Sequence, residues 1–457
     1  MFFYGSQNQK AHHLSLMFMP LTEDQITQLA PDAASVKAGQ QLATTSKWVS
    51  KAIHEKAMWG NCQGSGKNPY RTMVDLQKIA FKCSCPSRKF PCKHGLGLLY
   101  LYARASSDFT TAAALEPDVE EWVSKRAAKA DAKEPKEETA APKKTDAKGQ
   151  EKRAEEREKK VSAGLEELRV WLRDLVRNGI HQIPSVSPSF YRTIAARMVD
   201  AQVPAMANAL NRLHQLPYHQ DGWQKPFLRR ISSLYLLSEA YQYLPHVPVP
   251  LQTDIKTLIG WNTPKEQVLQ QEGILDAWLV LSRELEEEDR LTTEHIWLVG
   301  QQHQRFALLL NFYPMGQVPQ FALVVGTTIT AELVYYPSAY PLRALVKGQQ
   351  GLQPSTLPSA EPDFNSVLNQ VAHALALQPF LEQLPFLVSE VKVVHQKEKW
   401  YLVDQHQHRL PLLNPEVEGW RVLATSAAAP FTAFIIYTPD GVTLRAYWVQ
   451  QQFYPLP

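Results

Sequence analysis

Hydrophobic periodicity predicts a helical middle region between residues 161 and 290. In VSAGLEELRVWLRDLVRNGI (161–180), leucine and valine side chains recur every three or four positions and share one helical face, and Gly179 provides a stop signal. Further helices are expected near residues 189–213, 225–244 and 264–286.

The pattern changes to short β-rich runs over residues 291–457. These runs combine β-branched and aromatic residues and are separated by turn residues, which is typical of strands. A helix is expected at residues 363–377 between the two groups of runs. The predicted strands are HIWLVGQ, QRFALLLNFY, QFALVVGT and TAELVYYP, followed by KWYLVDQ, WRVLATS, FTAFIIYT and TLRAYWVQ.

The N-terminal part, residues 19–105, mixes both patterns. Residues 22–43 look helical, residues 71–83 alternate like a strand, and the apolar run LGLLYLYAR (96–104) predicts a helix. The fold class is therefore α+β and multidomain, with an N-terminal mixed domain, a helical middle segment and a β-rich C-terminal region.

A linker is expected at residues 106–160, acidic at first and then rich in both charges. Residues 125–160 contain no aromatic and no large aliphatic side chain, so they cannot bury enough surface to offset chain entropy. The last part, EKRAEEREKK, has charges at helical spacing and is expected to extend the next helix.

Net charge is distributed unevenly along the 457 residues. Residues 1–105 carry 13 basic and five acidic side chains, a net of +8, whereas residues 106–124 carry five acids and no base. Residues 161–457 carry 22 bases and 26 acids, a net of −4. The positive N-terminal domain is compatible with a nucleic-acid or acidic-protein partner.

Nothing in the sequence predicts a membrane span. No run of 18 apolar residues occurs, and the apolar stretch at residues 14–21 lacks the basic start and cleavage site of a signal peptide. The sequence from Met19 reads like an ordinary N-terminus, so a true start near Met19 instead of Met1 is an open alternative. The chain contains only four cysteines, three of them within ten residues, which favours a reducing, cytoplasmic setting and a metal site over disulfides.

The cysteine cluster predicts one structural zinc ion. Cys83, Cys85, Cys92 and His94 form the pattern Cys-x-Cys-x₆-Cys-x-His. Three cysteines and one histidine are a standard tetrahedral ligand set for structural zinc. A catalytic zinc keeps an open coordination position and a nearby base, and neither is indicated here.

The residues between these ligands predict a strand end facing a helix start. Cys83 and Cys85 are two positions apart and would project from the same side of a strand, and Pro86 would help to turn the chain. Pro91 suits the first position of a helix, which would place Cys92 in the first turn.

Other candidate sites are weaker. GNCQGSGKN (60–68) lacks the first glycine and the final Ser/Thr of a phosphate-binding loop, so a tight turn or a contact loop is the better interpretation. Cys62 is expected to be a small buried residue near Trp59. His395, His406 and His408 have spacings too loose to indicate a metal site.

Basic side chains surround the ligands. They could offset the negative charge of a three-thiolate zinc site, or they could present a basic surface to phosphate or to an acidic protein. The candidate partner or nucleic-acid contacts are Lys67, Tyr70, Lys82, Arg88, Lys89 and Lys93.

The spacing CxC…CxH resembles the SWIM zinc finger. WGNCQGSGKNPY followed by CSCPSRKFPCKHGLGLLYL is similar to the bacterial SWIM zinc-finger family, as are GLEELRVWLRDLVRNGI, AARMVDAQVPAMANALNRL and YYPSAYPLRALV. The resemblance covers most of the chain from about Met19. It implies a ββα zinc module at about residues 71–104 that binds DNA or proteins. It also implies partners such as MoxR-type AAA+ ATPases and von Willebrand A proteins, because the genes of bacterial family members often lie beside genes for these proteins.

Three functional hypotheses follow. The first is a non-enzymatic adaptor for protein partners. The second is DNA or RNA binding through the basic N-terminal domain, supported by its charge of +8 together with Trp48, Trp59, Tyr70 and Phe90. The third is an enzyme with a site in the C-terminal region, which no catalytic motif in the sequence supports.

Overall fold

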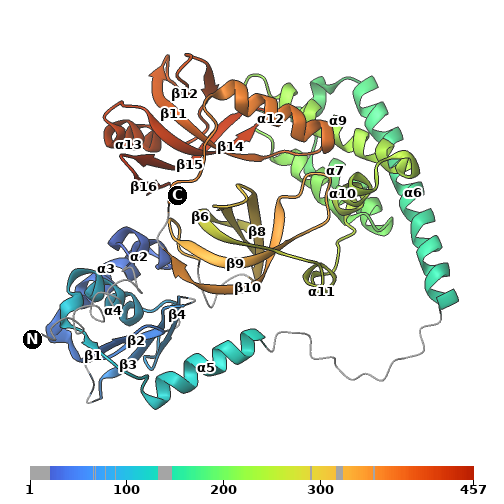
Figure 1. Cartoon of the computed structure of the whole chain (residues 1–457). Coiled ribbons are helices and arrows are strands. Elements are labelled where there is room, and N and C mark those ends of the chain that lie inside the picture. Colours follow the sequence, from blue (N-terminus) through green and yellow to red (C-terminus); the bar gives the residue numbers. More distant parts are fainter. Residues whose placement is uncertain are drawn as a thin grey trace, which may run out of the picture.

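The computed structural model describes residues 21–64, 66, 68–77, 79–87, 89–131, 147–288, 291–314, 323–353 and 356–456. Figure 1 shows an N-terminal module in blue, a helical bundle in green, a β-barrel in yellow and a C-terminal sheet in red. The expected α+β multidomain fold is confirmed.

The N-terminal module is a five-stranded sheet with helices on both faces. One face packs on α3 and α4 through buried residues that include Trp48, Val74, Leu96 and Leu98. The sheet order is β4-β3-β2-β1-β5. The elements are α2 (Glu23–Leu29), α3 (Ala33–Leu42), β1 (Trp48–His54), β2 (Ala57–Cys62), β3 (Tyr70–Asp75), β4 (Ala80–Cys83), α4 (Lys93–Arg104), β5 (Thr110–Thr111) and α5 (Pro117–Asp131).

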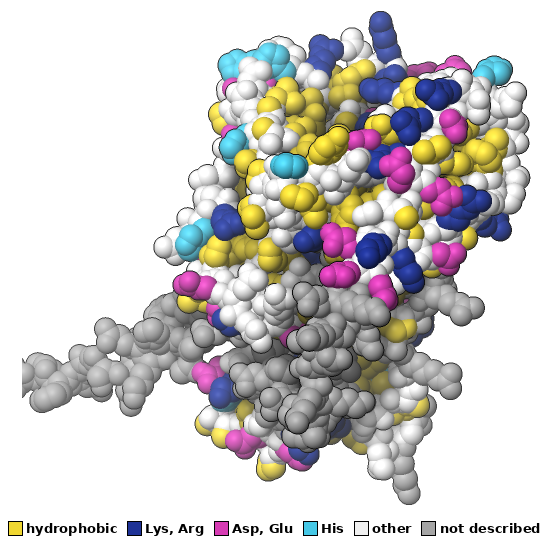
Figure 2. Space-filling model, turned by 90° about the vertical axis from the view of Figure 1, so that its right-hand side faces the viewer, with side chains coloured by type: hydrophobic (Ala, Val, Ile, Leu, Met, Phe, Trp, Pro, Cys, Tyr) yellow, Lys and Arg dark blue, Asp and Glu magenta, His cyan; other side chains and the backbone are white. Residues whose placement is uncertain are grey.

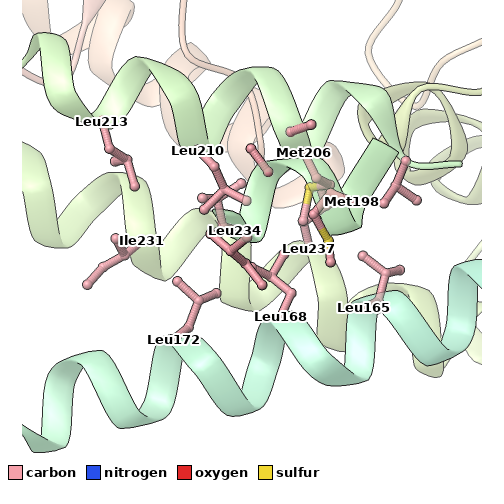
Figure 3. Close-up of a cluster of buried hydrophobic side chains, with 14 of the residues drawn as sticks. Leu165, Leu168, Leu172, Met198, Met206, Leu210, Leu213, Ile231, Leu234 and Leu237 are labelled. Atoms are coloured by element: carbon pink, nitrogen blue, oxygen red, sulfur yellow. The ribbon is translucent and has the colours of Figure 1, made fainter. Parts of the chain in front are cut away.

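Helices fill residues 147–269. α6 is long, and its leucine stripe faces α8 and α9 across a core of leucine, isoleucine and methionine side chains (Figure 3). Arg157, near the charged start of α6, lies 4.5 Å over the ring of Trp261. The helices are α6 (Ala147–Arg177), α7 (Pro188–Asp200), α8 (Pro204–Asn211), α9 (Gln224–Gln242), α10 (Val249–Ile259) and α11 (Lys265–Leu269).

The next five strands form a closed barrel in the order β10-β8-β7-β6-β9. All neighbours pair antiparallel except β8 and β10, which pair in parallel. The barrel interior contains Trp278, Leu298, Ile329 and other buried apolar side chains. The strands are β6 (Ile274–Glu288), β7 (Leu291–Gly300), β8 (Phe306–Pro314), β9 (Thr328–Tyr335) and β10 (Arg343–Gln353).

A six-stranded sheet with two helices ends the chain. Its order is β13-β12-β11-β14-β15-β16. The elements are α12 (Phe364–Leu377), β11 (Leu384–Gln396), β12 (Lys399–Val403), β13 (Arg409–Pro411), α13 (Glu416–Ser426), β14 (Phe431–Thr438), β15 (Gly441–Val449) and β16 (Gln452–Pro455).

The barrel joins the other parts. Its outer face shares a buried cluster with the C-terminal sheet, in which Trp297 and Val299 meet Phe434 and Trp448. Val324, in the segment before β9, is buried in the core of the N-terminal module. The barrel therefore lies between the N-terminal module and the C-terminal sheet, as Figure 1 shows.

Several predicted elements are confirmed. The helix expected at 22–43 is two helices, α2 and α3, and those expected at 96–104 and 363–377 are α4 and α12. The charged segment before residue 161 does extend a helix, because α6 begins at Ala147. Gly179, at φ +83°, follows the end of α6 as expected.

Five expectations about the elements are wrong. The linker expected from residue 106 begins later, because β5 pairs with β1 and α5 packs Val119 against Trp59. Residues 71–83 are a hairpin of β3 and β4 instead of one strand. Residues 264–286 contain the short α11 and most of β6, because β6 pairs with both β7 and β9. WRVLATS lies in helix α13. The described part of QFALVVGT, residues 323–327, is a turn segment. The alternative starts at Met1 and Met19, and part of the linker (132–146), lie outside the described residues.

Candidate metal centre

The four predicted ligands come from a strand end, the loop after it and the start of a helix. Cys83 ends β4, Cys85 lies in the following bend, Cys92 is the N-cap residue of α4, and His94 lies in its first turn. Pro91 precedes the N-cap, so the prediction that it occupies the first helical position is wrong. The hairpin and the helix therefore deliver two ligands each to one point.

The ligand atoms form a compact group. They all lie within 4.8 Å of one another. The Nδ1 atom of His94 is 3.8 Å from the Sγ atom of Cys83 and 4.0 Å from that of Cys92. In a tetrahedron with zinc–sulfur bonds of about 2.3 Å and zinc–nitrogen bonds of about 2.0 Å, neighbouring ligand atoms are about 3.5–3.8 Å apart. The group is thus able to bind a metal ion with small adjustments.

The electrostatics of the thiols favour a bound cation. A hydrogen bond shared with Cys92 lowers the pKa of Cys83 to about 3, while that hydrogen bond raises the pKa of Cys92, and burial raises the pKa of Cys85. A metal ion is what makes three neighbouring thiolates compatible, because coordination deprotonates each thiol.

Backbone N–H groups also favour the thiolate forms. The N–H groups of Cys85, Ser87 and Gly95 hydrogen-bond the thiols of Cys83, Cys85 and Cys92 respectively, and each lowers the pKa of its partner. Amide dipoles that converge on sulfur compensate for the negative charge that remains on a zinc ion with three thiolates.

Neighbouring side chains fix the ligands in place. The hydroxyl of Thr72 lies 3.3 Å from the Sγ atom of Cys83. The ring of Tyr70 lies against that of His94, with centroids 4.8 Å apart. Gly95 allows α4 to approach Phe81, since a Cβ atom at position 95 would lie 2.7 Å from that ring. The ligands are therefore held between the hairpin and the helix.

The predicted contact residues have different environments. Lys82 and Lys93 are exposed beside the ligands, whereas Tyr70 is half-buried against His94. Lys89 is exposed but forms an ion pair with Asp32 at 2.7 Å, and its hydrogen bond lowers the pKa of Asp32 to about 2. Lys67 and Arg88 lie outside the described residues.

Cys62 does not join the ligand group. It pairs with Trp48 in the β1–β2 register and is fully buried in the core between the sheet and α4, where burial raises its pKa to about 11. The expectation that Cys62 packs near Trp59 is wrong, because Trp59 belongs to the cluster on the opposite face of the sheet.

The sequence did not predict that helix α5, with Glu116 and Asp118 at its start, covers that opposite face; we call this the acidic cover. Helix α5 and the residues before it pack Val119 against Trp59, and the Trp59 indole donates to Glu116 at 2.6 Å. Arg71 pairs with Glu116 at 2.6 Å and with Asp118 at 3.0 Å. The acidic run at 106–124 and the aromatic Trp122 within a charged segment were the available signals, and Trp122 is partly buried against this cluster.

In the described part of the chain, no second group of His, Cys, Asp and Glu side chains suited to a metal ion occurs. The ring centroids of His406 and His408 are 6.0 Å apart, and the ring of His395 packs against Trp400 and Trp420. Among the described helices, none is long and apolar enough to cross a membrane.

Two family models match the chain. The SWIM zinc finger model matches residues 70–103, which hold all four ligands, and the model for the SWIM-associated four-helix bundle domain matches residues 156–259, which hold α7 to α10 and most of α6. The predicted resemblance to SWIM-type zinc-finger proteins is confirmed, and a SWIM zinc finger implies zinc as the metal. Neither a curated protein nor a solved structure matches the chain.

Proposed function

We propose that Cys83, Cys85, Cys92 and His94 bind one zinc ion and that its role is structural. Four protein ligands complete a tetrahedral site and leave no position for water or substrate. The zinc would fasten the β3–β4 hairpin to the start of α4. A bound zinc ion would supply positive charge, which would hold the thiolates of Cys83, Cys85 and Cys92 close together.

We further propose that the protein is a non-enzymatic adaptor that brings protein partners together. The observation that carries this proposal is the acidic cover of α5 on the finger's sheet. With residues 106–124 included, the net charge of residues 1–124 falls from +8 to +3, and Arg71 is already neutralised by Glu116 and Asp118. A phosphate-binding surface needs unpaired basic side chains along the path of the backbone.

The charge pattern on one face of the molecule bears on the choice between a protein and a nucleic acid as partner. On the face shown in Figure 2, Lys and Arg side chains alternate with Asp and Glu, and hydrophobic side chains lie between them. Because acidic side chains interrupt the basic ones, this face offers no continuous positive path for a phosphate backbone. By family resemblance, the partners would be MoxR-type AAA+ ATPases or von Willebrand A proteins.

Nucleic-acid binding is the second candidate, supported by the exposed Lys82 and Lys93 beside the metal centre. The two functions are separated by co-purifying the tagged protein from its native cells with and without nuclease, followed by mass spectrometry. An adaptor retains stoichiometric protein partners after nuclease treatment. Recovery of nucleic acid alone, lost on nuclease treatment and weakening steeply with salt, would contradict the adaptor proposal.

A further inference from the structure

A cleft of about 420 Å³ lies between the barrel and the C-terminal sheet. Its walls are the end of β7, the loop to β8 and the start of β8, the loop 340–342 before β10, the segment 359–361, and residues of α12 and β11. Apolar and polar side chains contribute about equally to its surface, and the apolar ones include Val299, Phe306, Leu342, Phe386 and Leu387. Its volume suits one large side chain and the backbone next to it.

The position of this cleft on the barrel is informative. Counted from β6, the five strands follow one another around the barrel in the order first, second, third, fifth, fourth, and the third and fifth strands pair in parallel. This is the topology of the oligonucleotide- and oligosaccharide-binding barrel, whose ligands lie across strands two and three beside the loop between strands four and five. Here the C-terminal sheet covers much of the outer face of β7 and β8, and the cleft is bordered by Val299, Phe306 and the loop residues 340–342.

The rim of the cleft carries one exposed cation. The guanidinium of Arg305 lies 4.3 Å over the ring of Tyr335, which fixes its position. Among the described residues, no carboxylate forms an ion pair with Arg305. A stacked arginine without a carboxylate partner, beside an apolar surface, is suited to bind the carboxylate of a ligand.

The charges nearby disfavour a nucleic-acid strand in this place. Arg305 is the one cation among the described residues that line the cleft, and Glu361 lines it too. Single-stranded nucleic acid requires a continuous positive groove and exposed aromatic rings for stacking. Phe306 is already stacked on Phe434, with centroids 6.2 Å apart.

We propose that this cleft binds the C-terminal end of a partner protein, with the last apolar side chain in the cleft and the terminal carboxylate on Arg305. A C-terminal residue carries an apolar group and a carboxylate on the same Cα atom, which matches an apolar surface and an arginine within one small cleft. Tyr340 lines the same cleft, and burial raises its pKa, so its phenol remains a hydrogen-bond donor. The proposal rests on the adaptor function and names the class of partner group recognised.

The test uses the full-length, zinc-loaded protein and two pools of fluorescent hexapeptides. Both pools have five randomised positions and end in Leu or Phe, one with a free carboxylate and the other with an amide. Fluorescence anisotropy should show saturable binding of the free-acid pool and at least about tenfold weaker binding of the amide pool. Arg305→Gln should weaken binding of the free-acid pool by a similar factor, whereas Arg305→Lys should retain part of it. The matched control is Arg409→Gln, on β13 outside the cleft, which should bind like the wild type.

The proposal is overturned if the two pools bind alike, if neither binds, or if Arg305→Gln binds like the wild type. Hexanoate that competes at a concentration equal to that of the peptides would make the ligand a small acid. A ten-nucleotide thymidine oligonucleotide that binds the wild type and not Arg305→Gln would make it a nucleic acid. If nuclease-resistant partners bind the wild type and Arg305→Gln alike, the adaptor function stands and this cleft does not explain it.

Discussion

At the scale of single residues, the ligand set was predictable from spacing alone. Three of the four cysteines in the chain lie within ten residues, and the structure brings their sulfurs and His94 within 4.8 Å of one another. The short separation of the ligands along the chain explains this success, because such residues need only the end of a hairpin and the start of a helix to come together. The acidic residues that pair with Arg71 come from 45 and 47 residues away, and no local pattern announces such a contact.

Replacing one ligand should unfold the finger locally. Cys85→Ser is expected to lose stoichiometric zinc and to expose residues 71–104 to protease, because zinc binding contributes about 10–16 kcal/mol to the folding of small fingers. Metal analysis and limited proteolysis followed by mass spectrometry measure both effects. Cys62→Ser is the matched control, since Cys62 is buried outside the ligand group and its variant should retain zinc. Unchanged zinc content and digestion in Cys85→Ser would show that Cys85 is not a ligand.

At the scale of elements, the close contact between α3 and α4 supports the metal centre. A Cβ atom at Gly97 would lie 2.8 Å from the Cβ atom of Leu42 and 3.2 Å from the carbonyl oxygen of Gly39. Both helices would have to move apart to admit it, and α4 carries Cys92 and His94. The stability of the site therefore depends on residues that never touch the metal.

Gly97→Ala should thus weaken the module by about 1–3 kcal/mol through overpacking. The expected result is faster transfer of zinc to a chelator, measured with a colorimetric zinc indicator. Gly348→Ala is the control, because no atom lies within 4 Å of an added Cβ there. Equal rates of zinc transfer in the two variants would argue against this coupling between helix packing and metal retention.

An ion pair between α9 and the β14–β15 turn should make stability depend on pH. The hydrogen bonds from Arg229 lower the pKa of Asp440 below its ordinary value. A lowered folded pKa means that the pair stabilises the fold above about pH 4 and that this contribution is lost as the pH falls through the folded pKa. The pair is partly exposed, so its contribution is about 0.2–1 kcal/mol.

Asp440→Asn should therefore lower the urea midpoint slightly at pH 7, and its difference from the wild type should shrink toward pH 3. Asp200→Asn, an exposed position on α7, serves as the control and should show no such trend. A difference that stays constant between pH 7 and pH 3 would show that the carboxylate charge is not responsible.

Element types were predictable where periodicity was strong and failed where tertiary pairing decided. The leucine stripe of α6 was correctly predicted because one face of a helix packs on one core. WRVLATS is rich in β-formers but lies in α13, where Gly419 packs directly against the Trp400 ring. β6 contains Leu and Glu at helical spacing, yet it is a strand because β7 and β9 pair with its two edges.

At the scale of the whole molecule, the barrel links parts whose arrangement no local pattern predicts. Val324 from the barrel is buried in the core of the N-terminal module, and the Gln25 side-chain amide donates to the carbonyl of Val325 at 3.2 Å. Trp297 and Val299 lie in a core shared with the C-terminal sheet. These contacts predict that destabilising the zinc finger also destabilises the segment 323–327, and that the helical bundle keeps its stability.

Removing zinc with a chelator should thus destabilise only part of the chain. Hydrogen–deuterium exchange should rise over residues 70–104 and 323–327, because both contribute to the same core, and should stay unchanged over residues 188–259. A parallel sample with the chelator saturated by added zinc is the control. Exchange that rises throughout the chain would show a single cooperative unit, and exchange that rises nowhere would contradict a structural role for the metal.

The central claim is a single structural zinc ion held by three thiolates and one imidazole. Zinc K-edge X-ray absorption on the purified protein, combined with metal analysis, tests it most directly. We expect one zinc per chain with three sulfur neighbours at about 2.3 Å and one nitrogen neighbour at about 2.0–2.1 Å. A metal content well below one per chain, or a first coordination sphere dominated by oxygen and nitrogen, would contradict it.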